Sequence, residues 1–123
     1  MAGRRRPRRR YLVFKIIAPA NFKPSREAVE KALSESLHSL LGMAGAASTI
    51  LRLEQYDEER RAGIIASDNR SLERARAAVA AVTSIDGVPC IIHIVKVTGT
   101  LRRARELASS YDHPALRALE RLL

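Results

Sequence analysis

Histidine, cysteine and the carboxylates are the side chains of this sequence that could take part in catalysis or bind a metal ion. Their spacing matches no catalytic or metal-binding motif. His38, His93 and His113 are far apart, and no two have metal-ligand spacing. Cys90 is the only cysteine, so neither an intrachain disulfide nor a thiolate cluster is possible. The acidic residues at positions 54–59 fit no calcium loop and are typical of a solvated turn. We therefore expect no catalytic residue, no metal site and no cofactor bound by the protein.

Arginine is the second chemical signal, and it indicates binding to phosphate. The chain has 18 arginines against 4 lysines and a net charge of +9. Because a planar guanidinium makes bidentate contacts with phosphate, a polyanion is the expected partner. The candidate RNA-binding residues are six arginines near the start and three in a predicted helix: Arg4, Arg5, Arg6, Arg8, Arg9, Arg10, Arg102, Arg103 and Arg105.

Residues 1–10, called the leading segment below, hold six of the nine net positive charges. Like charges repel, so we expect this basic arm to be disordered alone. A solubility or targeting tail is the alternative interpretation. For the three arginines of the predicted helix, the alternative is a merely solvated face.

The remaining residues, 11–123, have the length of a single domain with one core. Hydrophobic residues make up 46% of the chain, which is enough to fill that core. The longest apolar runs are broken by Lys15 and His93, so no membrane span is expected. No secretory signal is recognised either, and a cytoplasmic protein is expected.

Apolar patterning predicts the elements of the first half. Residues 11–18 are rich in β-branched and aromatic side chains and predict a central strand. Ser25 is a suitable cap for an amphipathic helix that ends at Gly42. Residues 42–47 predict a tight connection or one short helical turn.

The second half predicts a hairpin, a helix, a strand and further helices. Residues 49–56 and 62–67 alternate as paired strands around a charged turn. Asp68, Asn69 and Ser71 offer caps for a helix with one apolar face, and residues 88–97 form the next strand. Helices follow from about residue 101, the last of them beginning near Pro114.

This order predicts an α+β fold, the split βαβ plan shared by ferredoxin-like and RNA-recognition domains. Two helices would pack on a four-stranded antiparallel sheet, with extra C-terminal helices. RNA-recognition domains stack bases on strand aromatics, but here the first strand has only Tyr11 and Phe14 and the third has none. We expect the open sheet face, with residues such as Ile17 and Ile94, to be covered by the C-terminal helices or by a partner.

Three segments resemble a known family when taken together. They are RYLVFKI at 10–16, LRLEQYDEERRAGIIASDNRSLERARAAVAAVTSIDGVP at 51–89, and VKVTGTLRR at 95–103. In amino-acid sequence and in their order along the chain, they are similar to the archaeal ribonuclease P protein component 2 family. The resemblance covers the chain from about residue 10 to residue 103.

The resemblance implies a protein subunit of ribonuclease P, the ribonucleoprotein endonuclease that removes the 5′ leader from precursor tRNA. The ribonuclease P RNA would supply the catalytic centre and its Mg²⁺, so the protein is not expected to be an enzyme by itself. Component 3 would be the protein partner, in a heterodimer or a two-plus-two heterotetramer. The RNA contacts of the leading segment come from charge and not from the resemblance.

Two other functions stay open at this point. One is a ribosomal or other RNA-associated protein of the same fold without a role in tRNA processing. The other is a ferredoxin-like regulatory module that binds a small ligand at a dimer interface. The charge argues against the second, although residues 11–123 carry only +3.

Overall fold

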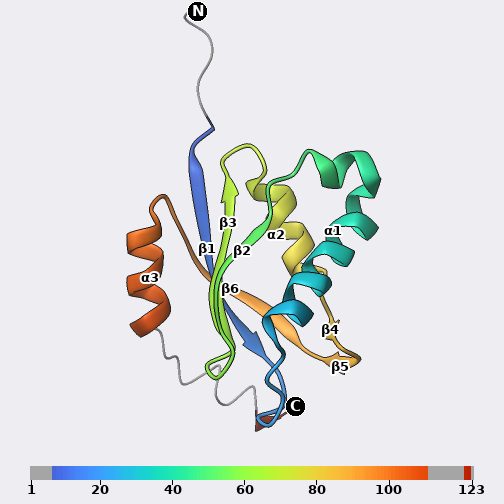
Figure 1. Cartoon of the computed structure of the whole chain (residues 1–123), viewed down its shortest axis with the longest axis vertical. Coiled ribbons are helices and arrows are strands. Elements are labelled where there is room, and N and C mark those ends of the chain that lie inside the picture. Colours follow the sequence, from blue (N-terminus) through green and yellow to red (C-terminus); the bar gives the residue numbers. More distant parts are fainter. Residues whose placement is uncertain (1–6, 111–120, 123) are drawn as a thin grey trace, which may run out of the picture.

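The computed structural model describes residues 7–110, 121 and 122. An antiparallel four-stranded sheet has the order β2-β3-β1-β6, with helices on both faces (Figure 1). Its strands are β1 (Arg9–Ile17), β2 (Arg52–Asp57), β3 (Ala62–Asp68) and β6 (Ile91–Thr98). The helices are α1 (Arg26–Ala47), α2 (Leu72–Ala80) and α3 (Leu101–Ser110). The predicted split βαβ plan is confirmed, and the predicted helix from Pro114 falls largely outside the described residues.

β1 is a central strand, as its apolar residues predicted, but it begins earlier than expected. Arg9 and Arg10 pair with Asp68 and Ser67 of β3 in the antiparallel register. The predicted boundary after residue 10 therefore falls inside a strand, and the last two residues of the leading segment belong to the sheet. The reason is that β3 extends far enough to offer them backbone partners. Residues 1–6 lie outside the described residues.

α1 begins where the sequence predicted, and its helical geometry is interrupted at Gly42, where the sequence predicted its end. The Ser25 hydroxyl accepts a hydrogen bond from the Ala28 N–H at 3.2 Å and caps the helix. Gly42 has a φ of 71°, which interrupts the helical geometry before a short second segment ending at Ala47. Glycine tolerates this conformation because it has no Cβ. Both the end at Gly42 and the helical turn after it are confirmed.

The strand predicted over residues 88–97 is interrupted. β4 (Ser84–Ile85) and β5 (Val88–Pro89) form a separate small hairpin, and β6 starts only after Cys90. Proline has no N–H for continued pairing, and the Cys90 N–H donates to the Thr83 carbonyl at 3.0 Å. The prediction of one continuous strand was therefore wrong.

The sheet has a core on each face. The larger core, against α1 and α2, contains Leu12, Phe14 and Ile65 among others. The smaller one joins Tyr11, Val13, Ile64 and Ala66 of the sheet to Ala104 of α3. One of the C-terminal helices therefore covers the face on which RNA-recognition domains stack bases, as one of the two alternatives predicted.

Ile94 lies on the sheet face that packs against α1 and α2, whereas we expected it on the open face. It packs against the larger core, opposite Phe14 in the register of β1 with β6. The register shifts between Val13 and Phe14, so that Val13 pairs with Lys96 whereas Phe14 pairs with Ile94. Alternation read from the sequence alone does not detect such a bulge. The place predicted for Ile94 on the open face was wrong.

The hairpin between β2 and β3 holds a buried arginine. Arg61 is only 5% exposed and has a φ of 52°. Its Nη1 donates to the carbonyl oxygens of Ala18, Pro19 and Phe22 at 3.0, 2.8 and 3.2 Å. The guanidinium thus satisfies three acceptors in the loop that follows β1.

Candidate nucleic-acid interface

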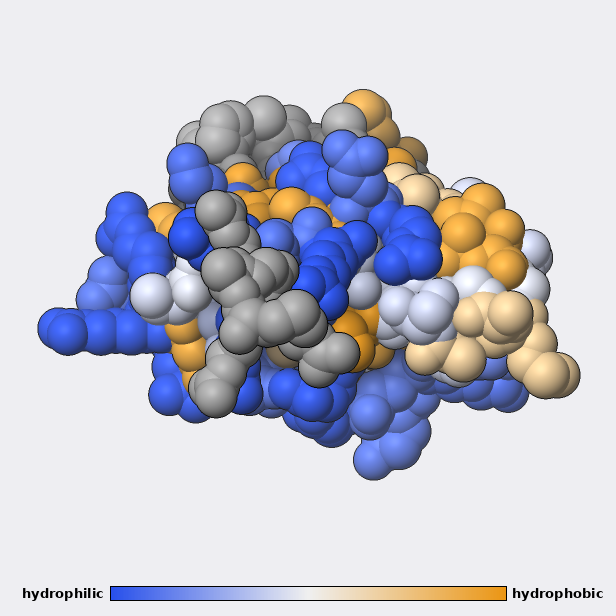
Figure 2. Space-filling view, turned by 90° about the horizontal axis from the view of Figure 1, so that it is seen from above, coloured by the Kyte–Doolittle hydropathy of each residue, from blue (hydrophilic) through white to orange (hydrophobic). Residues whose placement is uncertain are grey.

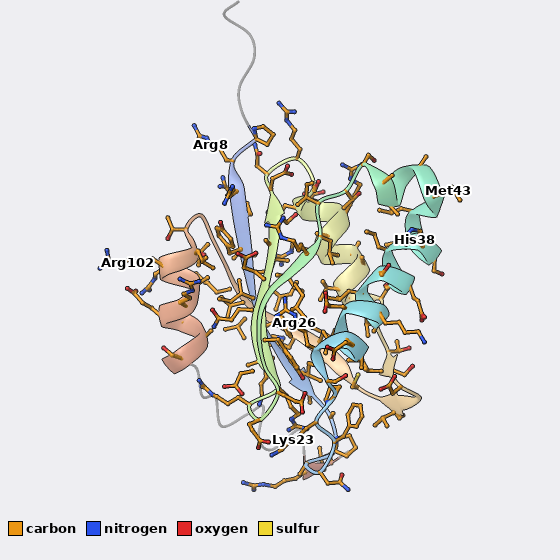
Figure 3. All side chains as sticks on the ribbon, in the orientation of Figure 1. Arg8, Lys23, Arg26, His38, Met43 and Arg102 are labelled. Atoms are coloured by element: carbon orange, nitrogen blue, oxygen red, sulfur yellow. The ribbon has the colours of Figure 1, made fainter. Side chains whose placement is uncertain are left out.

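The structure brings five of the nine candidate arginines toward one end of the sheet. We call these residues, Arg8, Arg9, Arg10, Arg102 and Arg103, the basic end. Figure 3 shows Arg8 at the start of β1 and Arg102 at the start of α3 on the same side of the molecule. Arg4, Arg5 and Arg6 lie outside the described residues.

Antiparallel pairing explains why residues so far apart in the chain come together. Tyr11 near the start of β1 pairs with Thr98, the last residue of β6, and α3 begins at Leu101. Arg10 Nη1 lies 3.7 Å from the position that a Cβ would take at Gly99. The guanidinium of a leading-segment arginine therefore lies beside the turn that begins α3.

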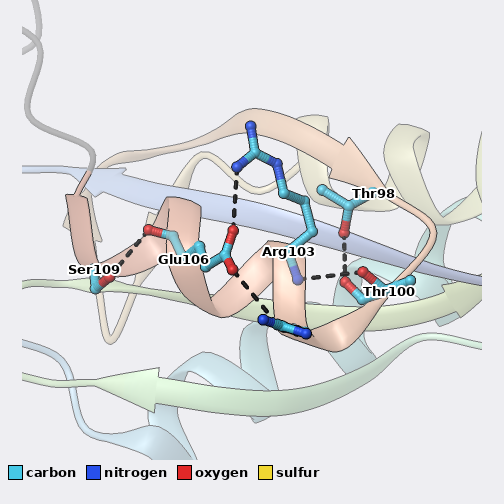
Figure 4. A network of polar contacts seen from close by, with 6 residues as sticks. Thr98, Thr100, Arg103, Glu106 and Ser109 are labelled. Carbon is cyan, nitrogen blue, oxygen red and sulfur yellow. Dashed lines mark hydrogen bonds and ion pairs between the residues drawn. The ribbon is translucent and has the colours of Figure 1, made fainter.

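The arginines of the first turn of α3 are exposed and share one carboxylate. Arg103 Nη1 lies 3.2 Å and Arg102 Nε 3.7 Å from the carboxylate oxygens of Glu106 (Figure 4). The Arg102 side chain is 92% exposed. Thr100 caps the helix, since its hydroxyl accepts from the Arg103 N–H at 3.2 Å. Two guanidinium groups against one carboxylate leave a net positive charge at this turn.

Arg9 and Asp68 define the rest of the electrostatics here. The hydrogen bond between Arg9 and the Tyr11 side chain raises the pKa of Arg9, which stays charged at every physiological pH. Asp68 Oδ1 accepts from the Ser71 N–H at 2.7 Å and so stabilises the turn before α2. Figure 2 looks onto this end of the molecule and shows many hydrophilic residues on it, with hydrophobic residues between them and in a larger group on the right of the view.

Arg105 lies apart from the basic end, although it was predicted with Arg102 and Arg103. Its Nε donates to Gln55 Oε1 of β2 at 3.2 Å. The side chain is therefore directed across the sheet toward the edge strand β2. All three arginines lie outside the apolar face of α3, as predicted, because Leu101, Ala104 and Leu107 pack on the sheet.

Comparison with known proteins identifies the family. The Rpp14/Pop5 family profile matches residues 10–109. The chain belongs to the Rpp14/Pop5 family. Ribonuclease P protein component 2 of Archaeoglobus fulgidus is 38% identical over 100 residues, covering 81% of this chain and 87% of the relative. Its counterpart in Methanosarcina mazei is 33% identical over 103 residues, covering 82% and 84%. The resemblance seen in the sequence is confirmed.

A solved structure supports the same fold. One chain of the cryo-EM structure of yeast ribonuclease MRP superposes with a TM-score of 0.67 at 12% identity. The match covers 97% of this chain and 91% of that chain. At this identity the likeness concerns the fold alone.

Base stacking has little support in the described part of this Rpp14/Pop5 protein. Tyr11 is buried under α3, and Phe14 is buried in the larger core. Tyr56 stacks on Phe14 with ring centroids 6.2 Å apart, and Phe22 is half-buried. Within residues 7–110, no phenylalanine or tyrosine is exposed. The exposed groups at the basic end are guanidinium groups, which are common donors to phosphate oxygens.

The residues considered for catalysis do not converge. His38 is exposed on α1, where its Nδ1 lies 2.8 Å from the Ser34 carbonyl oxygen, and His93 lies on β6. His113 lies outside the described residues. Among residues 7–110, no three His, Cys, Asp or Glu side chains are grouped closely enough to hold a metal ion. None of the helices in this same range combines the length and hydropathy needed to cross a bilayer.

Asn69 makes a contact with the basic end that the sequence pattern did not predict. This residue had been considered only as a cap for α2, yet its side chain contacts the backbone of Arg8. Arg70 follows it in the same exposed turn. The pairing of β1 with β3 would have indicated that this turn lies beside the leading segment, since the end of β3 is opposite the start of β1.

Proposed function

We propose that this protein works as the component 2 subunit of ribonuclease P and binds the RNA of that enzyme through the basic end. The observation that carries the proposal is the placement of Arg8, Arg9, Arg10, Arg102 and Arg103 toward one end of the sheet in a member of the Rpp14/Pop5 family. Neutralising phosphates that crowd together in a folded RNA would stabilise the fold and lower its requirement for Mg²⁺.

The contacts we expect are to the RNA backbone. Guanidinium groups form charge-assisted hydrogen bonds with phosphate oxygens, and these contacts depend on shape more than on base sequence. The absence of exposed phenylalanine and tyrosine in residues 7–110 favours this mode over stacking on bases. Folded, helical regions of RNA are therefore the expected targets, and precursor tRNA is the substrate of the assembled enzyme.

We propose further that the RNA, and not this chain, performs the cleavage with Mg²⁺. The family resemblance supports this division, and the two histidines of the described residues lie on separate elements, His38 on α1 and His93 on β6. The protein would then act on the reaction only by stabilising the RNA. We expect it to work in the cytoplasm.

A protein partner is the second part of the proposal, and component 3 is the expected one. Three large hydrophobic side chains are exposed at the bent end of α1 and in the loop after it. They are Leu40 at 48%, Met43 at 83% and Ile50 at 46%. Figure 3 places Met43 across the molecule from Arg102, so one chain could bind protein and RNA together.

Reconstitution tests the proposal. Ribonuclease P RNA, a component 3 protein and precursor tRNA would be mixed with and without this chain at low Mg²⁺, and release of the 5′ leader would be measured. At low Mg²⁺ we expect cleavage to require this chain. At high Mg²⁺ we expect cleavage to depend on the chain less strongly. Equal cleavage without the chain at every Mg²⁺ concentration would exclude the proposed role and favour another RNA-associated function for this fold.

The partner surface is tested separately. Met43→Glu places a charge in the exposed apolar surface, and we expect it to weaken co-purification with component 3 while RNA binding by the isolated chain is retained. His38→Glu, an exposed change on the same helix, is the matched control. Full pairing by the Met43 variant would show that component 3 binds elsewhere.

A further inference from the structure

The turn between β3 and α2 makes a contact with the leading segment that the proposed RNA binding does not require. Asn69 Oδ1 accepts a hydrogen bond from the Arg8 N–H at 2.9 Å. The Asn69 N–H donates in return to the Arg8 carbonyl oxygen at 2.8 Å. Both main-chain groups of Arg8 are thus held by one residue that lies 61 positions away in the chain.

We propose that Asn69 is a positioning residue for RNA binding. By holding Arg8 before the first residue of β1, it fixes the place and direction from which the chain toward residue 1 starts. Arg4, Arg5 and Arg6 precede Arg8 in the sequence, and the exposed Arg70 directly follows Asn69. The inference rests on the proposed function, because it concerns how the leading segment reaches the same RNA as the basic end.

The surrounding contacts support this role for the Asn69 side chain. Its neighbour Asp68 already accepts from the Ser71 N–H, so the turn into α2 is stabilised without the Asn69 amide. Asn69 is exposed and lies outside the core, and its φ is not positive, so alanine can adopt its backbone conformation. Replacing it with alanine should therefore leave the domain folded.

The expected effect follows from effective concentration. A basic segment held beside the RNA-binding surface binds as part of one ligand, whereas a loosened segment pays an additional ordering cost. We expect Asn69→Ala to weaken binding of ribonuclease P RNA about fivefold, as for a partial loss of such tethering. The number of phosphates contacted does not change, so the dependence of affinity on salt should keep its slope.

A double-mutant cycle tests the inference. Asn69→Ala is made in the full chain and in a chain lacking residues 1–8, and the Kd for ribonuclease P RNA is measured for all four proteins. Residues 9 and 10 are kept because they belong to β1. We expect a loss of affinity in the full chain and none in the shortened one. Hydrogen exchange at the Arg8 amide should accelerate, while the melting temperature stays the same.

Asn21→Ala is the matched control, since Asn21 is an exposed asparagine in the turn after β1. An equal loss of affinity with and without residues 1–8 would overturn the inference, because Asn69 would then act through the domain itself. No loss in the full chain, although removal of residues 1–8 weakens binding, would also overturn it and leave the proposed function intact. If removal of residues 1–8 changes nothing, the role proposed for the leading segment fails as well.

Discussion

Arginine side chains are exposed where β1 begins, whereas at the opposite end of β1 Arg61 is buried and bound to three carbonyl oxygens. Lys15 and Arg60 are joined there too, since Lys15 Nζ donates to the Arg60 carbonyl. At the opposite end of β1, the Arg61 guanidinium and the Lys15 ammonium thus bind carbonyl groups of the fold itself. At the basic end, Arg102 and Arg103 share one carboxylate and keep donors for a partner. Net charge alone does not distinguish these uses.

The largest effect is expected at Arg61, at the end of β1 opposite the basic end. Arg61→Met removes the donor of three carbonyl groups, and we expect the free energy of unfolding to fall by about 3 kcal/mol. Urea unfolding measures this change. The exposed neighbour provides the control, because Arg60→Met should alter stability by no more than about 0.5 kcal/mol. Equal effects of the two variants would contradict the distinction between buried and surface arginine.

At the basic end, substitutions should weaken RNA binding and leave the free energy of unfolding nearly unchanged. Arg10, Arg102 and Arg103 are changed together to Gln, and we expect RNA affinity to fall at least about tenfold at moderate salt, with a salt slope lower by about 2 to 3. Unfolding in urea should be nearly unchanged. The control replaces Lys23, Lys31 and Arg60 with Gln, which removes the same charge elsewhere. A similar loss in the control would mean that overall charge, and not this end, determines binding.

Arg105 tests how far the basic end extends along α3. Since its guanidinium already contacts Gln55, we expect Arg105→Gln to lower RNA affinity only about twofold, which is typical of a peripheral charge. The affinity is measured at the same salt as for the triple variant. A loss as large as that of the triple variant would place the RNA over the outer face of α3.

The smallest effect is expected on the pH dependence of stability, through the partly buried Tyr56 of β2. Burial raises the pKa of Tyr56 from 10.0 to about 12, with a further contribution from Glu58. The folded protein then keeps a proton that the unfolded chain has lost, so stability should fall as pH rises from 10 toward 12. We expect Tyr56→Phe to reduce this decline in urea unfolding at several pH values. An unchanged decline would assign it to other groups.

Elements governed by local pattern were predictable from the sequence. The Ser25 cap, the end of the first helical segment at Gly42 and the alternating hairpin depend on residues close in the chain, and each lies where it was predicted. Charge likewise indicated which residues of α3 are exposed. Local propensity and hydrophobic period carry this information without any tertiary contact.

Contacts between distant segments account for what was missed. The burial of Arg61 depends on carbonyl groups 39 to 43 positions away, and the contact of Asn69 with Arg8 joins residues 61 positions apart. Neither side chain has a local pattern that distinguishes it from a solvated one. The meeting of Arg10 with the turn at Gly99 also follows only once β1 is paired with β6.

Cys90 gives the protein a built-in reporter of local opening. It is the only cysteine, it is 4% exposed between β5 and β6, and burial raises the pKa of its thiol. A thiol reagent should therefore react only when this segment separates from the core, at a rate set by the opening equilibrium. Labelling rates of the free chain and of the assembled ribonucleoprotein would then measure how strongly assembly restrains this part of the sheet, without any added probe.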